Sequence, residues 1–199
     1  MKFSGRRFLS GERTFLTFFI AGFVAGIFIV NIGKSILLGD TGLFDENTLY
    51  RMKGMSLDGN ALFCFVLRKR IGRMLMLAIL STTYLGMAAC MGMTLWYGAS
   101  AGAFLAALTL RYGLKGILLA LVSVFPQYLF YIPAALTMLV WCKELFQGIY
   151  IRGEFSAGDK GLLVKKAGRL AAILGVIIIG CLLEGYVNPW LVLGFLKIF

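Results

Sequence analysis

The run GILLALVSVFPQYLFYIPAALTMLVW, from Gly116 to Trp141, contains no charged residue. A helix needs about 20 predominantly apolar residues to cross the ~30 Å hydrocarbon core of a bilayer. This run is long enough, so it predicts a transmembrane helix. Pro126 and Pro133 lie inside it, and each proline removes a backbone donor. We therefore expect this helix to be broken at membrane depth.

The rest of the chain has the same character. Apolar residues make up 60% of the 199 residues, charged residues only 15%, and the mean hydropathy is +0.87. A soluble domain has about 25% charged residues. The formal net charge of +11 comes from basic residues that flank apolar runs, which favours contact with the membrane surface over binding of nucleic acid.

These runs predict an all-α fold, a polytopic helical bundle in a single integral membrane domain, 1–199, with about five transmembrane helices. The expected spans are about 14–33, 74–96, 97–110, 116–141 and 170–192. A tight hairpin near Tyr97 and Gly98 would separate the second span from the third. The apolar stretch Ala61–Leu67 is too short to cross and is left open between an interfacial and a re-entrant segment.

Orientation is predicted from the first span. Residues 1–13 are expected to form a cytoplasmic tail, since four basic residues precede the span and only Lys34 follows it closely. An excess of Lys and Arg marks the cytoplasmic flank of a membrane helix. The chain is therefore expected in the bacterial cytoplasmic membrane, with its N-terminus inside.

Glu184 lies within the last apolar run, and a carboxylate at such a position tends to face protein, water or a partner. A proline-broken helix also needs neighbouring groups to satisfy its freed carbonyls. We expect Gln127 and Glu184 to hydrogen-bond inside the bundle. The candidate buried polar cluster comprises Pro126, Gln127, Glu184, Asn188 and Pro189.

Small residues predict where helices pack closely. Gly22 and Gly26 are four residues apart in the first span, and Gly98 and Gly102 repeat that spacing in the third. Such spacing allows two helix backbones to approach each other. These four glycines are the candidate helix-packing residues.

The sequence has no pattern of an enzyme. It contains no histidine, which removes the commonest general base and metal ligand. Its four cysteines include no C-x-x-C pair, so neither a zinc site nor a redox dithiol is indicated. We expect no catalytic residues, no metal and no cofactor.

Several of these stretches together resemble the stage II sporulation protein M family of bacterial membrane proteins. The resembling residues are Ala21-Gly22-Phe23-Val24-Ala25-Gly26 leading to Asn31, Gly98 to Gly102, Gly116 to Gln127 with Ile132-Pro133, and Leu183-Glu184-Gly185-Tyr186 with Asn188-Pro189. They occur in the same order over most of the chain, and the Pro-Gln block is the most specific.

The resemblance implies a non-enzymatic membrane scaffold or anchor required for sporulation. In that family's pattern the protein holds two peptidoglycan-degrading partners, a lytic transglycosylase and an amidase-endopeptidase, at the septal membrane during forespore engulfment. The mother-cell septal or engulfing membrane is then the expected location. The chemistry of such a peptidoglycan remodelling complex belongs to the partners.

A second hypothesis is a small membrane transporter or permease-like subunit that uses Glu184 and the broken fourth span. Movement of a solute or ion by the reconstituted protein would separate it from the scaffold. The expected partners are the lipid bilayer and the two hydrolases, with no nucleic acid. Homo-oligomer formation stays open.

Overall fold

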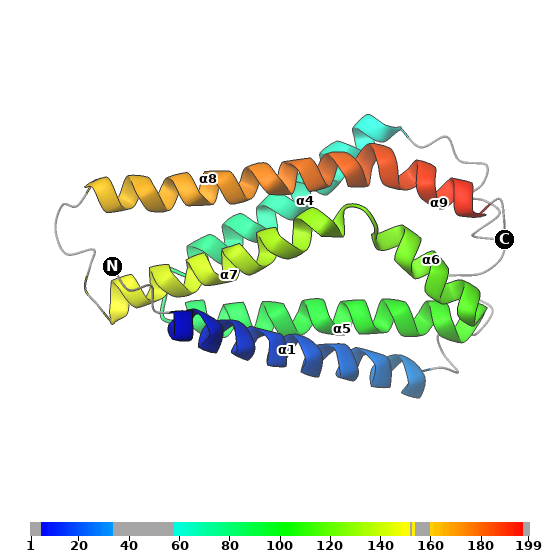
Figure 1. The fold of residues 1–199 in the computed structure, drawn as a ribbon, viewed down its shortest axis with the longest axis horizontal. Helices are drawn as coiled ribbons and strands as arrows, with labels where there is room; N and C mark the ends of the chain where they lie inside the picture. The colour runs from blue at the N-terminus through cyan, green and yellow to red at the C-terminus, as the bar shows by residue number, and fades with distance from the viewer. Residues whose placement is uncertain (1–4, 34–57, 152, 154–159, 197–199) are drawn as a thin grey trace.

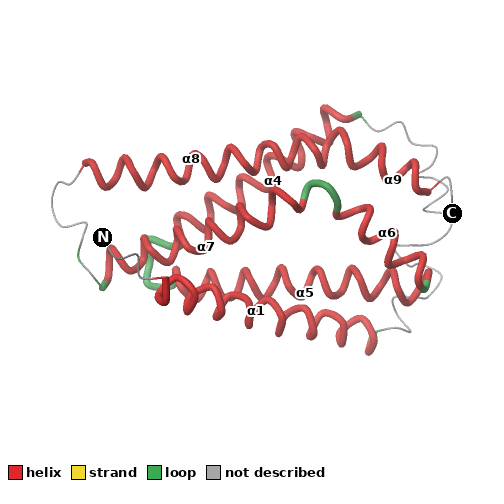
Figure 2. Tube along the Cα trace, viewed as in Figure 1, coloured by secondary structure: helices red, strands yellow, loops and turns green. Residues whose placement is uncertain are grey.

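The computed structural model describes residues 5–33, 58–151, 153 and 160–196, and the secondary structure in these ranges is helical (Figures 1 and 2). The elements are α1 (Gly5–Ile32), α4 (Gly59–Leu80), α5 (Gly86–Tyr112), α6 (Leu114–Val124), α7 (Tyr128–Tyr150), α8 (Lys160–Leu182), the π-helical segment η1 (Leu183–Val187) and α9 (Asn188–Leu196). The polytopic, all-α bundle expected from the sequence is confirmed.

The helices run side by side along the long axis of the molecule (Figure 1). The α1 and α5 helices lie together at one edge, α8 lies at the opposite edge, and α6 and α7 run between them. Successive passes along this axis are α1, α4, α5, α6 with α7, and α8 with η1 and α9. The start of α1, the α4–α5 turn, the end of α7 and the start of α8 therefore share one end of the bundle.

Four helical stretches are long and apolar enough to cross a membrane. They are Arg13–Ile32, Gly86–Tyr112, Tyr128–Tyr150 and Gly161–Phe195. The fifth pass, α4, has 22 residues and carries Arg68, Lys69, Arg70 and Arg73 near its middle. It nevertheless contacts α5, α7, α8 and η1 along the bundle.

The structure corrects the expected second and third spans. The hairpin predicted near Tyr97 and Gly98 is wrong, because α5 is one continuous helix of 27 residues. The turn lies earlier, between Leu80 and Gly86, and it carries no charge. Ala61–Leu67 forms the first part of α4, a continuous helix from Gly59 to Leu80.

Hydroxyl side chains explain the position of this turn. Ser81, Thr82 and Thr83 each donate a hydrogen bond of 2.7 Å to the carbonyl three residues earlier. These bonds satisfy carbonyls that the end of α4 would leave without a helical partner. Gly86 then lies against the backbone of Ser81, so α5 starts directly beside the end of α4.

Other boundaries also differ from the expected ones. The α1 helix already begins at Gly5, so residues 5–13 of the predicted tail are helical, whereas residues 1–4 lie outside the described part. Residues 34–57, between α1 and α4, lie outside it too. The α7 helix continues to Tyr150, past the expected end of the fourth span at residue 141. The α8 helix starts at Lys160, before the expected start of the last span at residue 170.

The fourth pass is broken, but at one proline only. Phe125 has extended backbone angles, φ −85° and ψ 141°, and separates α6 from α7. A residue that precedes proline is disfavoured in the helical region, so Pro126 explains the break. Pro133 lies inside α7 without ending it, and Thr137 Oγ1 donates to the Pro133 carbonyl oxygen at 2.7 Å.

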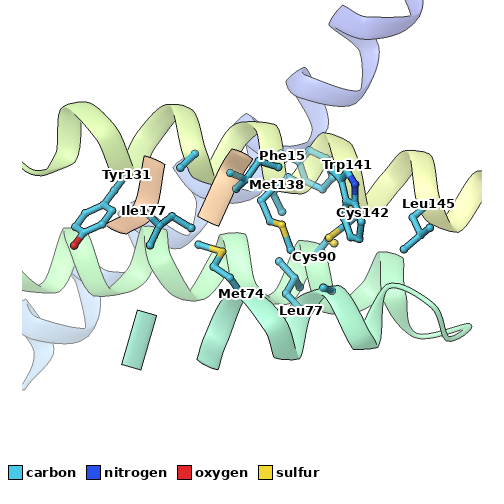
Figure 3. Packing of buried hydrophobic residues seen from close by; sticks show 14 of the residues in the cluster. Phe15, Met74, Leu77, Cys90, Tyr131, Met138, Trp141, Cys142, Leu145 and Ile177 are labelled. Atoms are coloured by element: carbon cyan, nitrogen blue, oxygen red, sulfur yellow. The ribbon is translucent and has the colours of Figure 1, made fainter. Parts of the chain in front are cut away.

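The main core joins α4, α5, α7 and α8 with the start of α1 (Figure 3). Met138, Cys142, Ile177 and Cys181 are fully or almost fully buried within it. Sulfur-containing and aliphatic side chains of this kind fill irregular gaps between helices. The core holds α4 against the apolar helices and so fixes the depth of its basic residues.

Candidate functional site

An ion pair between α4 and η1 lies at the centre of the bundle. Arg70 Nη2 donates to both carboxylate oxygens of Glu184, at 3.2 Å to Oε1 and 3.0 Å to Oε2. The two side chains are 17% and 22% exposed, so most of the pair is removed from the surface. Leaving one of two buried charges unpaired is strongly destabilising, and each of these groups supplies the other's counter-charge.

Tyr131, in the first turn of α7, completes this cluster. Its hydroxyl donates to Glu184 Oε2 at 2.7 Å, and the Arg70 guanidinium lies 4.4 Å from the centre of its ring. A guanidinium over an aromatic face at this distance is attracted by the ring. Arg70, Tyr131 and Glu184 therefore form an ionic cluster that joins α4, α7 and η1.

The π-helical segment positions the carboxylate. Glu184 is the second residue of η1, which separates α8 from α9. A π-helical turn inside an α-helix is rare and is frequent at functional sites. Gly185 lies against the backbone of Phe63 in α4, where an added Cβ would approach atoms at 3.0–3.3 Å, so η1 and α4 are close enough for the ion pair.

A second polar group lies at the break between α6 and α7. The Ser123 carbonyl, near the end of α6, accepts from Gln127 Nε2 at 2.6 Å and from Asn188 Nδ2 at 3.1 Å. The break after α6 leaves this carbonyl without its helical N–H partner. The two amides replace that donor and join α6, α7 and α9; we call them the amide cap.

The amide cap leaves two oxygens without partners. Gln127 Oε1 and Asn188 Oδ1 are buried and accept no hydrogen bond from the described residues, and Gln127 as a whole is only 2% exposed. Exchanging the nitrogen and oxygen of either amide would set two acceptors against each other at the Ser123 carbonyl, so the hydrogen bonds fix both orientations. An unsatisfied buried acceptor costs about 1–3 kcal/mol.

The predicted hydrogen bond between Gln127 and Glu184 is therefore wrong. Glu184 bonds to Arg70 and Tyr131, whereas Gln127 bonds to Ser123. Both side chains lie in the region where α6 and α7 meet η1 and α9, but they find different partners about one turn apart. Pro126 makes the break, and Pro189 follows Asn188 at the point where the π-helical segment continues into α9.

The four candidate glycines lie at one interface. A Cβ on Gly22 or Gly26 of α1 would collide with the carbonyl oxygens of Leu95 and Ala99 in α5. In return, a Cβ on Gly98 or Gly102 of α5 would collide with carbonyl oxygens of α1. The two backbones are in direct contact at these positions. Gly116 makes the same kind of approach between α6 and the Leu108 backbone of α5.

A family model described as stage II sporulation protein M matches residues 15–189. The chain belongs to that family. The match extends from the start of the first candidate span to Pro189. In this stage II sporulation protein M family member it therefore contains the glycine interface, the break at Pro126, the ionic cluster and the amide cap. No curated protein and no solved structure matches the chain. The family and the helices together establish a multi-pass membrane protein related to sporulation.

Arg70 and Tyr131 are the site residues that sequence reasoning missed. The second span expected from the sequence starts at about residue 74, so that prediction leaves Arg70 outside the spans. A carboxylate inside the membrane tends to pair with a cation. This tendency is the signal in the sequence that could have pointed from Glu184 to a basic partner such as Arg70. In the described ranges, no group of three or more His, Cys, Asp and Glu side chains could hold a metal ion.

Proposed function

We propose that this protein is a non-enzymatic membrane scaffold that recruits peptidoglycan-degrading enzymes to the septal membrane during forespore engulfment. The observation that carries the proposal is the closed pairing of Glu184. Its carboxylate is occupied by Arg70 and Tyr131, an arrangement suited to holding helices together. The partners are a lytic transglycosylase and an amidase-endopeptidase, as the family's pattern implies.

The test is copurification. The tagged protein, extracted in mild detergent from sporulating cells of its host, should retain both hydrolases. Cells that produce it with Gly98→Leu, which disrupts the α1–α5 interface, should lose them and stop at engulfment. Copurification of neither hydrolase with the native chain would contradict the scaffold.

A transporter is the second candidate, and the amide cap favours it. Two unpartnered oxygens beside a broken helix resemble the discontinuous helices that line substrate sites in membrane transporters. Purified protein in sealed liposomes should move no ion or solute if it is a scaffold. A flux that Gln127→Leu or Glu184→Gln abolishes would favour transport.

We also propose that the N-terminus is cytoplasmic. If α4 crosses the membrane, its four basic residues lie within the crossing and are left out of the count of Lys and Arg on the two sides of the membrane. Ten Lys and Arg then flank the end that holds the N-terminus, against six at the other end. The ten are Lys2, Arg6, Arg7, Arg13, Lys143, Arg152, Lys160, Lys165, Lys166 and Arg169, and the six are Lys34, Arg51, Lys53, Arg111, Lys115 and Lys197.

Two turns test this orientation. Thr83 lies in the α4–α5 turn and Leu114 at the start of α6, and both are exposed. In a variant without the native cysteines, an impermeant thiol reagent added to intact cells should label Leu114→Cys and not Thr83→Cys. The reverse pattern would place the N-terminus outside.

A further inference from the structure

The outer face of α4 has no partner among the described residues. Phe65, Arg68, Lys69, Met76 and Ile79 are exposed along it, at spacings that put them on one side of a helix. Neither the Arg68 guanidinium nor the Lys69 ammonium has a hydrogen bond or ion pair with the part of the chain that the structure describes. The Lys69 ammonium lies only over the Phe65 ring, 5.5 Å from its centre.

These two cations lie near the middle of the pass. Arg68 is ten residues after Asp58 and twelve before Leu80, which is about 15 Å and 18 Å along a helix. A basic side chain at the centre of a membrane helix is costly unless it pairs with an opposite charge or reaches water. Arg70, two residues on, is offset by Glu184, whereas Arg68 and Lys69 have no counter-charge within the ranges that the structure describes.

We propose that this face of α4 is a docking site for a transmembrane helix of a partner protein that carries a carboxylate at mid-membrane depth. The inference rests on the proposed scaffold function and adds the chemistry by which a partner is recognised. A carboxylate between Arg68 and Lys69 would neutralise them where the dielectric constant is low and ionic attraction is strong.

The surface of α4 fits a helix. Gly72 lies one turn beyond Arg68, and a Cβ added there would meet nothing within 4 Å. An uncovered small residue of this kind lets a second backbone approach. Apolar side chains continue the face on either side of the charges, at Phe65 and at Met76 with Ile79, and they supply the packing surface.

A second copy of this chain is a poor occupant. It would set Arg68 and Lys69 against basic residues of the same kind, and like charges repel. The mid-membrane carboxylate in the described ranges, Glu184, is already held by Arg70 and Tyr131. Among the described residues no mid-membrane carboxylate is left for Arg68 and Lys69, and the proposal assigns the complementary charge to a different chain.

Synthetic membrane helices test the proposal without knowledge of the partner. The full-length protein, labelled at its amino terminus, is placed in vesicles of neutral phosphatidylcholine with labelled leucine-alanine helices that differ in one central residue, Glu or Gln. Energy transfer should show the Glu helix binding about tenfold tighter than the Gln helix. Equal binding of the two helices would overturn the proposal.

Variants locate the effect. R68Q with K69Q should abolish the preference, whereas R13Q with K165Q removes the same charge from exposed positions outside α4 and should keep it. R68E with K69E should reverse the preference toward a helix with a central Lys. Gly72→Leu, which leaves every charge in place, should weaken binding of the Glu helix, and unchanged binding would count against helix docking.

Lipid phosphate is the competing occupant. Native mass spectrometry of the protein from vesicles that contain phosphatidylglycerol measures which lipids stay bound. If lipid retention depends on Arg68 and Lys69 while the Glu and Gln helices bind equally, lipid phosphate replaces the partner helix as the occupant. If R68Q with K69Q loses neither helix preference nor hydrolase copurification, the docking site is wrong and the scaffold stands. Failure of copurification with the native chain would reject the scaffold by itself.

Discussion

The α1–α5 interface and the junction of α4, α7 and η1 hold one bundle together by different means. Between α1 and α5, glycines bring backbone to backbone, and no charged group takes part in the glycine contacts. At the junction, an arginine, a tyrosine and a carboxylate bond to one another across three elements. The first region is sensitive to added volume, and the second is sensitive to unbalanced charge.

The largest effect is expected from unbalancing the junction. Glu184→Leu removes the counter-charge of Arg70 and should lower the free energy of unfolding by about 3 kcal/mol. Glu184→Gln keeps an acceptor but not the charge, so its effect should be intermediate. Unfolding of purified protein by sodium dodecyl sulfate in mild detergent measures both.

The double variant Arg70→Leu with Glu184→Leu is the control for this prediction. It removes both charges and should recover most of the stability that the single variant loses. Two single losses that simply add in the double variant would mean that the pair is not coupled.

A smaller effect is expected from adding volume at the α1–α5 interface. Gly98→Leu places a side chain where the Phe19 carbonyl of α1 already lies. Overpacking of this kind costs about 1–3 kcal/mol. Gly92→Leu is a matched control in the same helix, since a Cβ at Gly92 meets nothing within 4 Å. The same unfolding measurement should separate them. Since leucine favours a helix more than glycine does, equal loss in both would show that packing against α1 is not the cause.

Removing one hydroxyl from the junction should have a still smaller effect. Tyr131→Phe loses the 2.7 Å hydrogen bond to Glu184 but keeps the ring beneath Arg70. The expected loss is about 0.6–1.7 kcal/mol, the range for hydrogen bonds between membrane helices. Tyr128→Phe, three residues earlier and at the surface, should change the unfolding free energy little. A larger effect at Tyr128 than at Tyr131 would contradict the assigned bond.

The smallest effect is expected at the amide cap. Gln127→Leu removes a donor to the Ser123 carbonyl, but it also removes the unpartnered Oε1, and the carbonyl keeps Asn188. These contributions oppose each other, so the unfolding free energy should change by less than about 0.5 kcal/mol. A loss above about 1.5 kcal/mol would show that Gln127 Oε1 has a donor in the membrane, and the transporter hypothesis would gain support.

The two regions also differ in how far the sequence predicts them. Four-residue glycine spacing is local, so Gly22, Gly26, Gly98 and Gly102 could be picked out, although their pairing could not. The break at Pro126 is equally local, because proline acts on its own helix. Each of these features is visible within a few residues of the chain.

The ionic cluster depends on residues far apart in the chain, and the sequence did not predict it. Arg70 and Glu184 are 114 residues apart, and no residue near Arg70 in the sequence indicates that its partner is a carboxylate. The Arg70–Glu184 pair was not predicted because the position of the α4–α5 turn was not predicted. The hydroxyl residues of this turn resemble ordinary span residues in composition, so the sequence predicts a second span over about 74–96 that runs through the turn and starts after Arg70.

The separation of Arg70 from Glu184 has a consequence for biogenesis. Because 114 residues lie between them, translation at about 5–20 residues per second leaves α4 without its counter-ion for roughly 6–23 seconds. Throughout that interval a helix with four cations must wait at the membrane surface or within the insertion machinery. We therefore expect α4, the second pass in the chain, to reach its final position only after the last pass has emerged from the ribosome.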